Sequence, residues 1–217
     1  MPTKPLRHRI AHDLLSIQAI SLSPAAPYTW ASGLRSPIYC DNRVTLAYPR
    51  IRRHIAEGFA ALMDVNQLTA DAIVGTATAG IAHAAWLAEH LHLPMAYVRS
   101  KPKAHGQGNQ IEGRLTQGQR VVVIEDLVST GGSSIKVVHA LEAAGVNVEA
   151  VLAIFSYGLP AADAAFAEAQ TPLYTLTTFP SLLEVALSSG QLDQAAIDSL
   201  KAWHTNPKAW SDAVEAV

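Results

Sequence analysis

The sequence predicts an α/β fold with a mostly parallel central sheet. Five apolar runs are continuous rather than alternating, which is typical of strands covered on both faces: residues 72–74, 95–98, 121–124, 148–155 and 173–176. Helix-like segments lie between them, beginning near Ala79, Thr130, Pro160 and Pro180. Strands that alternate with helices at this spacing predict right-handed crossovers, and therefore parallel neighbours.

The N-terminal part has a different pattern. Residues 7–20 fit an amphipathic helix, with apolar side chains at Ile10, Leu14, Leu15 and Ile17. Pro24 and Pro27 end it. Residues 28–43 mix aromatic and β-branched side chains around a turn, which predicts two short strands.

Two further helices complete the expected elements. Pro49 suits a first helical turn, so we expect a helix over residues 50–63. Residues 192–210 also have a helical pattern, and we expect them to pack back on the domain.

Composition limits the possible functions. With 217 residues, 49% of them hydrophobic and 16% charged, the chain is long enough for one large α/β domain. A formal net charge of -2 gives no overall attraction to nucleic acid or to acidic membranes. The single cysteine, Cys40, excludes an internal disulfide and a thiolate metal cage. Without a signal peptide or an apolar run of about 18 residues, we expect no membrane association and a cytoplasmic location.

The stretch VVVIEDLVSTGGSS, residues 121–134, joins an apolar strand to a glycine-rich helix start. The first amides of a helix have no intrahelical partner, glycines allow close approach, and the helix dipole favours an anion. The sequence therefore predicts a phosphate site at residues 129–133. The spacing of a Walker loop and of a dinucleotide-binding loop is absent.

Two adjacent acids precede this loop. Glu125 and Asp126 would repel a phosphate, but they suit a phosphorylated sugar whose hydroxyls donate hydrogen bonds to them. They would also stabilise positive charge that develops on the sugar ring. The alternative is that one acid caps the turn while the other is solvated. Their position between an apolar strand and a glycine-rich helix start favours the sugar site.

A second segment, VRSKPKAHGQGNQIEGRL, is basic and rich in glycine. We expect a long functional loop over residues 99–114, because it is too polar to bury and too glycine-rich for a stable helix. Its cations suit a pyrophosphate, and such a loop suits a lid that excludes water.

The first stretch resembles the phosphoribosyl pyrophosphate motif of type I phosphoribosyltransferases. The resemblance implies that this donor binds to the acids and the loop after them: Glu125, Asp126, Leu127, Val128, Ser129, Thr130, Gly131, Gly132 and Ser133. The two acids would act near the ribose, as catalytic residues.

The basic loop is similar to the catalytic loop of orotate phosphoribosyltransferases. That resemblance implies that Arg99, Lys103 and His105 contact pyrophosphate, with Lys103 and His105 also catalytic. It further implies a homodimer in which loop 99–114 reaches the neighbouring active site. Some members carry a lysine directly after the arginine, where this chain has Ser100 and then Lys101, so Lys101 has no assigned role.

Two more segments are similar to the same family: residues 28–43 to its N-terminal hood, and residues 74–88 to its pyrophosphate-side loop. Many members have lysines at the positions of Ala31 and Ala79. A second bacterial group has the same alanines as this chain, so the resemblance does not imply a lysine clamp on orotate. The resemblance assigns orotate to Ser129, and the weaker hood candidates are Ser32, Gly33 and Arg35. Tyr157 and Gly158 are further candidates to border the base.

Together these resemblances imply a type I phosphoribosyltransferase fold with five parallel strands, in a single domain. It would comprise a hood over residues 1–45, a core over 46–180 and C-terminal helices over 181–217. The implied reaction converts orotate and phosphoribosyl pyrophosphate to orotidine 5′-phosphate and pyrophosphate, in pyrimidine biosynthesis. Mg²⁺ is expected on substrate oxygens rather than in a protein cage. The alternatives are a purine phosphoribosyltransferase and a sensor of phosphoribosyl pyrophosphate.

Overall fold

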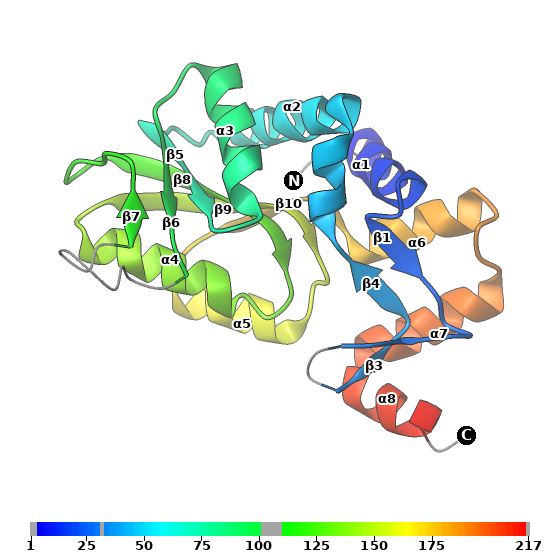
Figure 1. The fold of residues 1–217 in the computed structure, drawn as a ribbon. Helices are drawn as coiled ribbons and strands as arrows, with labels where there is room; N and C mark the ends of the chain where they lie inside the picture. The colour runs from blue at the N-terminus through cyan, green and yellow to red at the C-terminus, as the bar shows by residue number, and fades with distance from the viewer. Residues whose placement is uncertain (1–3, 31–32, 101–109, 216–217) are drawn as a thin grey trace.

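A computed structural model describes residues 4–30, 33–100 and 110–215, and its centre is a six-stranded sheet (Figure 1). The strand order is β10–β9–β8–β5–β6–β7. The bounds are β5 Ala72–Thr76, β6 Met95–Val98, β7 Ile111–Glu112, β8 Arg120–Val128, β9 Asn147–Ser156 and β10 Leu173–Thr178. The first five strands in this order pair in parallel, as predicted.

Strand β7 corrects the expectation of an unbroken loop over residues 99–114. Ile111 and Glu112 pair with Val98 and Tyr97 in antiparallel register. The pairing covers the edge of β6, whose amides and carbonyls otherwise have no partner on that side. The sixth strand is therefore an addition to the predicted five-stranded parallel sheet.

Helices cover both faces of the sheet (Figure 1). Their bounds are α1 Lys4–Ser16, α2 Pro49–Val65, α3 Gly80–Leu91, α4 Gly132–Ala143, α5 Pro160–Glu168, α6 Phe179–Ser188, α7 Gln194–Thr205 and α8 Pro207–Glu215. Val122 and Ile124 of β8 pack in one core with α1, α2, α3 and α6, whereas Val121 and Val123 pack in the other with α4 and α5. Continuous hydrophobicity along the strand thus serves two cores.

The N-terminal part forms two small antiparallel sheets rather than the two strands that were predicted. Strand β1 (Ile20–Leu22) pairs with β4 (Ile38–Cys40), and β2 (Tyr28–Thr29) pairs with β3 (Arg35–Ser36). A 3₁₀ helix, η1 (Asn42–Ala47), follows β4 and leads towards α2.

The C-terminal helices lie against these small sheets. The amide of Arg35 in β3 donates to Ser211 Oγ of α8 at 2.9 Å. The Trp30 ring packs on Trp203 of α7, with centroids 5.8 Å apart. Residues 192–210 were predicted as one helical segment, but α7 ends at Thr205, because Asn206 precedes a proline and helical backbone is disfavoured there.

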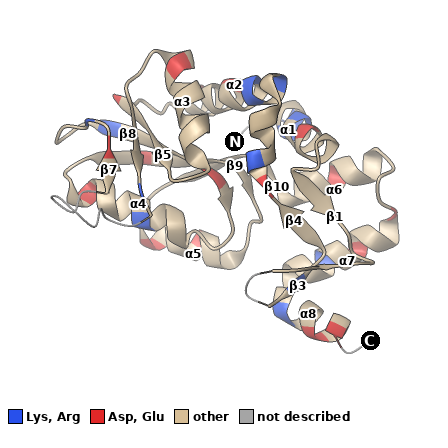
Figure 2. Cartoon of the chain, viewed as in Figure 1, with Lys and Arg blue, Asp and Glu red and all other residues tan. Residues whose placement is uncertain are grey.

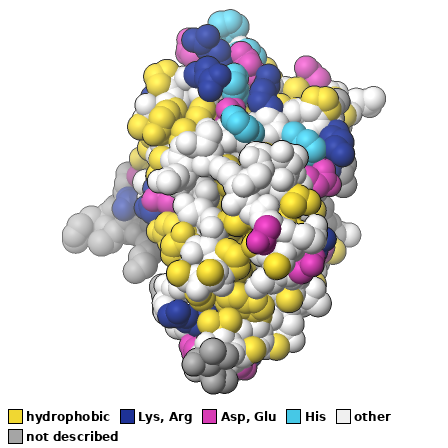
Figure 3. Space-filling view, turned by 90° about the vertical axis from the view of Figure 1, so that its right-hand side faces the viewer, with side chains coloured by type: hydrophobic (Ala, Val, Ile, Leu, Met, Phe, Trp, Pro, Cys, Tyr) yellow, Lys and Arg dark blue, Asp and Glu magenta, His cyan; other side chains and the backbone are white. Residues whose placement is uncertain are grey.

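Charge is distributed over all parts of the described chain. Figure 2 shows Lys and Arg interspersed with Asp and Glu along the elements. On the face shown in Figure 3, charged and His side chains gather at the upper end, near α1 and α2, and hydrophobic side chains lie below them. No helix within the described residues is long and apolar enough to cross a membrane.

Candidate active site

The predicted phosphate loop, residues 129–133 and called the phosphate loop below, lies at the junction of β8 and α4. Gly131 caps α4 with a φ of +83°, a left-handed conformation that glycine adopts without strain, and a Cβ there would lie 3.1 Å from the Phe166 ring. No side chain of the described chain caps this helix. Gly132 and Ser133 are exposed. The first amides of α4 therefore face an opening where an anion can accept their hydrogen bonds.

The two acids lie inside β8 rather than after it. The strand continues to Val128, because Glu125 and Leu127 still pair with Ala153 and Phe155 of β9. Successive side chains of a strand point to opposite faces. Glu125 and Asp126 therefore have different surroundings, which a strand ending at Ile124 had not predicted.

Glu125 belongs to the α4 face and is only 4% exposed. Its Oε2 accepts a hydrogen bond from Ser134 Oγ at 3.0 Å, and its Oε1 accepts one from the Asp126 amide at 3.1 Å. Burial, and next the charge of Asp126, raise the pKa of Glu125 well above its usual range. Glu125 thus connects β8 to the first turn of α4 and holds the phosphate loop in place.

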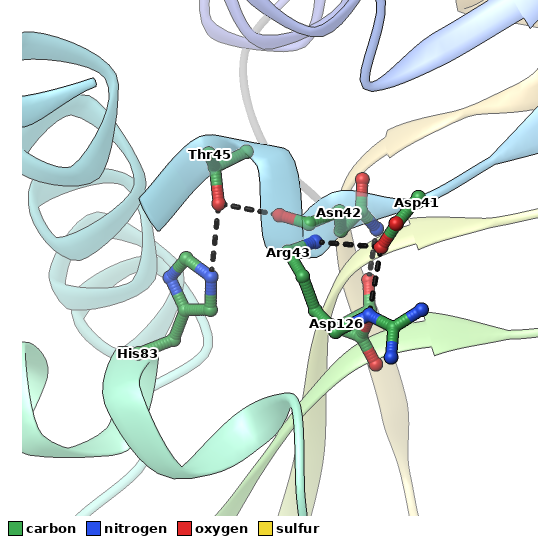
Figure 4. Close-up of polar contacts among 6 residues, drawn as sticks. All are labelled: Asp41, Asn42, Arg43, Thr45, His83 and Asp126. Atoms are coloured by element: carbon green, nitrogen blue, oxygen red, sulfur yellow. Dashed lines mark hydrogen bonds and ion pairs between the residues drawn. The ribbon is translucent and has the colours of Figure 1, made fainter. Parts of the chain in front are cut away.

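Asp126 faces the hood and is half-buried (Figure 4). Burial raises the pKa of its carboxyl, whereas the nearby Arg43 guanidinium lowers it. The Asp126 carbonyl accepts a hydrogen bond from Asn42 Nδ2 at 2.7 Å. Burial and next the Asp126 charge raise the pKa of the Cys40 thiol. Residues of β4 and η1 therefore surround this acid, the more open of the two.

A polar chain continues from Asn42 into α3 (Figure 4). Thr45 Oγ1 donates to the Asn42 carbonyl at 2.5 Å and lies 3.2 Å from His83 Nε2. Burial, and next the charge of Arg52, lower the pKa of His83 to about 4. Sequence analysis missed Asn42, Thr45 and His83. The one feature that could have indicated them is that they are polar residues next to apolar segments.

On the α4 face, a cavity of about 580 Å³ opens beside the phosphate loop. Its polar lining includes Thr76 at the end of β5, Arg99 after β6, and Ser133, Lys136 and His139 of α4. Thr76 Oγ1 is buried and has no hydrogen-bond partner within the described residues. Arg99 Nη1 lies 3.5 Å from Glu112 Oε1. The cavity thus brings the predicted pyrophosphate ligand Arg99 to the phosphate loop, together with Lys136 and His139, which sequence analysis missed.

Several sequence candidates lie outside the described residues. These are Lys103 and His105 of the basic loop, together with Lys101, and Ser32 and Ala31 of the hood. The roles expected of them stay predictions.

Of the other hood candidates, Gly33 lies in an exposed turn and Arg35 lies beside α8. Gly33 is exposed, with a φ of +88°, and its amide donates to the Trp30 carbonyl. Arg35 Nη1 donates to Thr29 Oγ1 at 3.0 Å, and its backbone bonds to α8 as described above.

Tyr157 lies within an aromatic cluster. It is 3% exposed and packs between Trp30 and Trp203, with centroids 5.7 Å and 5.8 Å away. Its carbonyl lies 2.6 Å from His204 Nε2. The Tyr157 ring therefore supports the hood, while Gly158 after it is exposed.

Metal-binding side chains are not clustered. Across residues 4–30, 33–100 and 110–215, no group of three or more His, Cys, Asp and Glu side chains is placed to hold a metal ion. A divalent ion at this site would need oxygens from a substrate, with Asp126 as the accessible carboxylate.

Comparison with known proteins shows the family of the chain. The family model for the phosphoribosyl transferase domain matches residues 46–163. The orotate phosphoribosyltransferase of Bacillus pumilus is 54% identical over 212 residues, which cover 98% of this chain and 100% of that protein.

Solved structures agree in fold. The crystal structure of orotate phosphoribosyltransferase from Aeropyrum pernix has a TM-score of 0.73 at 29% identity, and the match covers 85% of this chain and 99% of that one. Leishmania donovani UMP synthase has a TM-score of 0.78 at 25% identity, over 93% of this chain and 43% of that one. The chain therefore has the type I phosphoribosyltransferase fold and belongs to the orotate phosphoribosyltransferase family.

Proposed function

We propose that the chain transfers a phosphoribosyl group from phosphoribosyl pyrophosphate to orotate, giving orotidine 5′-phosphate and pyrophosphate. The carrying observation is the β8–α4 connection, where an accessible acid and an uncapped helix start lie a few residues apart. A phosphorylated sugar matches both, because it has hydroxyl donors and a phosphate acceptor. The name of the Bacillus pumilus relative supports orotate as the acceptor.

The donor would bind along this connection. The amides and hydroxyls of residues 129–133 would hold the 5′-phosphate, and Asp126 would accept hydrogen bonds from the ribose hydroxyls. Leu127 and Val128 would contact the donor through their backbone atoms. Glu125, held by Ser134, would keep strand and loop in register. Its predicted catalytic role near the ribose stays a prediction.

Pyrophosphate would leave on the α4 face. Arg99 lines the cavity there, beside Ser133 of the phosphate loop. Lys103 and His105 would complete its ligands from the basic loop, and Ser129 would contact orotate. Mg²⁺ would neutralise part of the pyrophosphate charge when bound.

The reaction would need no protein nucleophile. The bond between ribose C1 and the pyrophosphate oxygen breaks, and the new bond forms from orotate N1 to C1. The N1–H bond breaks as well, and its proton passes to the departing pyrophosphate or to water. Positive charge develops on the ring in between, and the Asp126 carboxylate would stabilise that charge.

We also propose the assembly that the family resemblance implies: a homodimer, with loop 99–114 reaching the neighbouring site. The proposed single domain consists of a hood over residues 1–45, a core over 46–180 and C-terminal helices over 181–217. The contact of α8 with β3 supports the proposal that the C-terminal helices and the hood act as one unit. We propose a cytoplasmic location, which the single cysteine supports.

Loss of orotate ultraviolet absorbance, on mixing with the chain, Mg²⁺ and phosphoribosyl pyrophosphate, tests the activity. We expect orotate to be consumed, and we expect no consumption of adenine or hypoxanthine when either replaces orotate in the mixture. Consumption of a purine instead would show that the acceptor is wrong. Binding of the donor without consumption of any base would favour a sensor.

Replacing Lys103 with alanine tests the catalytic loop. We expect turnover to fall by about 100-fold or more, because a charge-stabilising contact made in the transition state is lost, while orotate binding changes little. Near-normal turnover in this variant would contradict the role of Lys103.

A further inference from the structure

We infer that Arg43 is a specificity-determining residue that binds the carboxylate of the acceptor base. This inference rests on the proposed function. It identifies the side chain by which the site would distinguish orotate from pyrimidines that have no carboxylate. Neither the sequence motifs nor the resemblance pointed to Arg43.

Arg43 is held in place yet accessible. It lies in the first turn of η1, immediately after the hood strand β4. Asp41 Oδ1 accepts hydrogen bonds from its backbone amide at 3.2 Å and from its Nε at 2.8 Å. The side chain is 64% exposed, and its two Nη groups make no hydrogen bond with any residue of the described chain. The fork that recognises carboxylates is therefore oriented and open.

Its position suits the acceptor. Figure 4 shows the guanidinium beside Asp126, and the two charges interact. Asp126 would bind the ribose hydroxyls, so ribose C1 would lie within a few ångströms of it. The carboxylate of orotate is on C6, next to the N1 that bonds to C1. A base attached at C1 on the hood side would bring its carboxylate near Arg43.

Other described cations are less suitable. Arg99 and Lys136 line the cavity on the α4 face, with the phosphate loop. The Arg35 side chain donates a hydrogen bond to Thr29, and its backbone amide donates one to α8. Position 79, where many family members have lysine, carries alanine. Arg43 is the cation whose charge acts on Asp126 among those the structure describes.

Two nucleotides isolate this contact. Orotidine 5′-phosphate and uridine 5′-phosphate differ only in the carboxylate, and we expect both to bind to the phosphate loop. Isothermal titration calorimetry measures the affinity of each for the wild-type chain and for Arg43→Gln. We expect the substitution to weaken orotidine 5′-phosphate by about 10- to 100-fold, the range for a charge-assisted hydrogen bond, and to leave uridine 5′-phosphate within about 2-fold.

Three variants serve as comparisons. Arg43→Lys keeps the charge without the fork, so we expect part of the selectivity to return. Arg35→Gln tests the competing hood arginine, and Arg53→Gln removes an exposed charge from α2. Neither should change the ratio of the two affinities.

The outcomes are distinguishable. Equal weakening of both nucleotides by Arg43→Gln would overturn the inference, since it would show an effect through Asp126 or the fold. An unchanged ratio, or a changed ratio only in Arg35→Gln, would also overturn it. If the wild-type chain bound neither nucleotide and consumed no orotate, the proposed function itself would fail.

Discussion

Replacing His83 with glutamine should make the fold less sensitive to acid. The His83 ring is 1% exposed, between η1 and α3. Because the Thr45 hydroxyl already donates to the Asn42 carbonyl, His83 Nε2 must carry the proton and donate to Thr45. Nδ1 then has a buried lone pair without a partner in the described chain, and a second proton there would create a buried charge.

The size of the effect follows from the pKa. Burial and the Arg52 charge lower the pKa of His83 from 6.5 to about 4. Between these values the unfolded chain binds more protons than the folded one, so the free energy of unfolding falls as pH falls from 6.5 to 4. At about 1.4 kcal/mol per pKa unit, His83 contributes a loss of about 3 kcal/mol across this window.

Urea unfolding, followed by tryptophan fluorescence at pH 7, 5.5 and 4.5, measures this loss. Glutamine keeps an amide donor for Thr45 but does not titrate. We expect the stability difference between pH 7 and 4.5 to be smaller in His83→Gln than in the wild type by about 2 kcal/mol. His90→Gln, on the exposed side of α3, is the matched control. Equal pH dependence in His83→Gln and the wild type would refute the reasoning.

Three further substitutions test the site scaffold. A Cβ on Gly80 would overlap the Ile124 carbonyl, so Gly80→Ala should destabilise the chain by about 3 kcal/mol or more in urea unfolding. A Cβ on Gly132 would meet no described atom within 4 Å, so Gly132→Ala should cost less than about 1 kcal/mol, and equal costs would contradict this account. Glu125→Gln removes a carboxyl whose pKa is raised by burial. Above about pH 4.5 this carboxyl ionises in the unfolded chain before it does in the folded one, so the free energy of unfolding of the wild type falls as pH rises. The variant should therefore become more stable relative to the wild type between pH 6 and 8.5, as measured by thermal unfolding. A constant difference in stability across this range would be evidence against the account.

Local patterns predicted the sheet well. Continuous apolar runs identified all five parallel strands, and glycines with hydroxyl residues identified the start of α4. These features depend on neighbours in sequence, through side-chain periodicity and the unpaired amides of a helix start. Strand ends were less accurate, because pairing with β9 carries β8 on to Val128.

The sequence alone determined the fold class, the glycine-rich start of α4 and the presence of two acids before it. Tertiary structure decided which acid is accessible: the pleat of β8 directs Glu125 to Ser134 and Asp126 to the hood. It also brought Asn42 and Arg43 to Asp126 from more than 80 residues away. Contacts over such separations arise from packing of the hood on the sheet, and no local pattern encodes them.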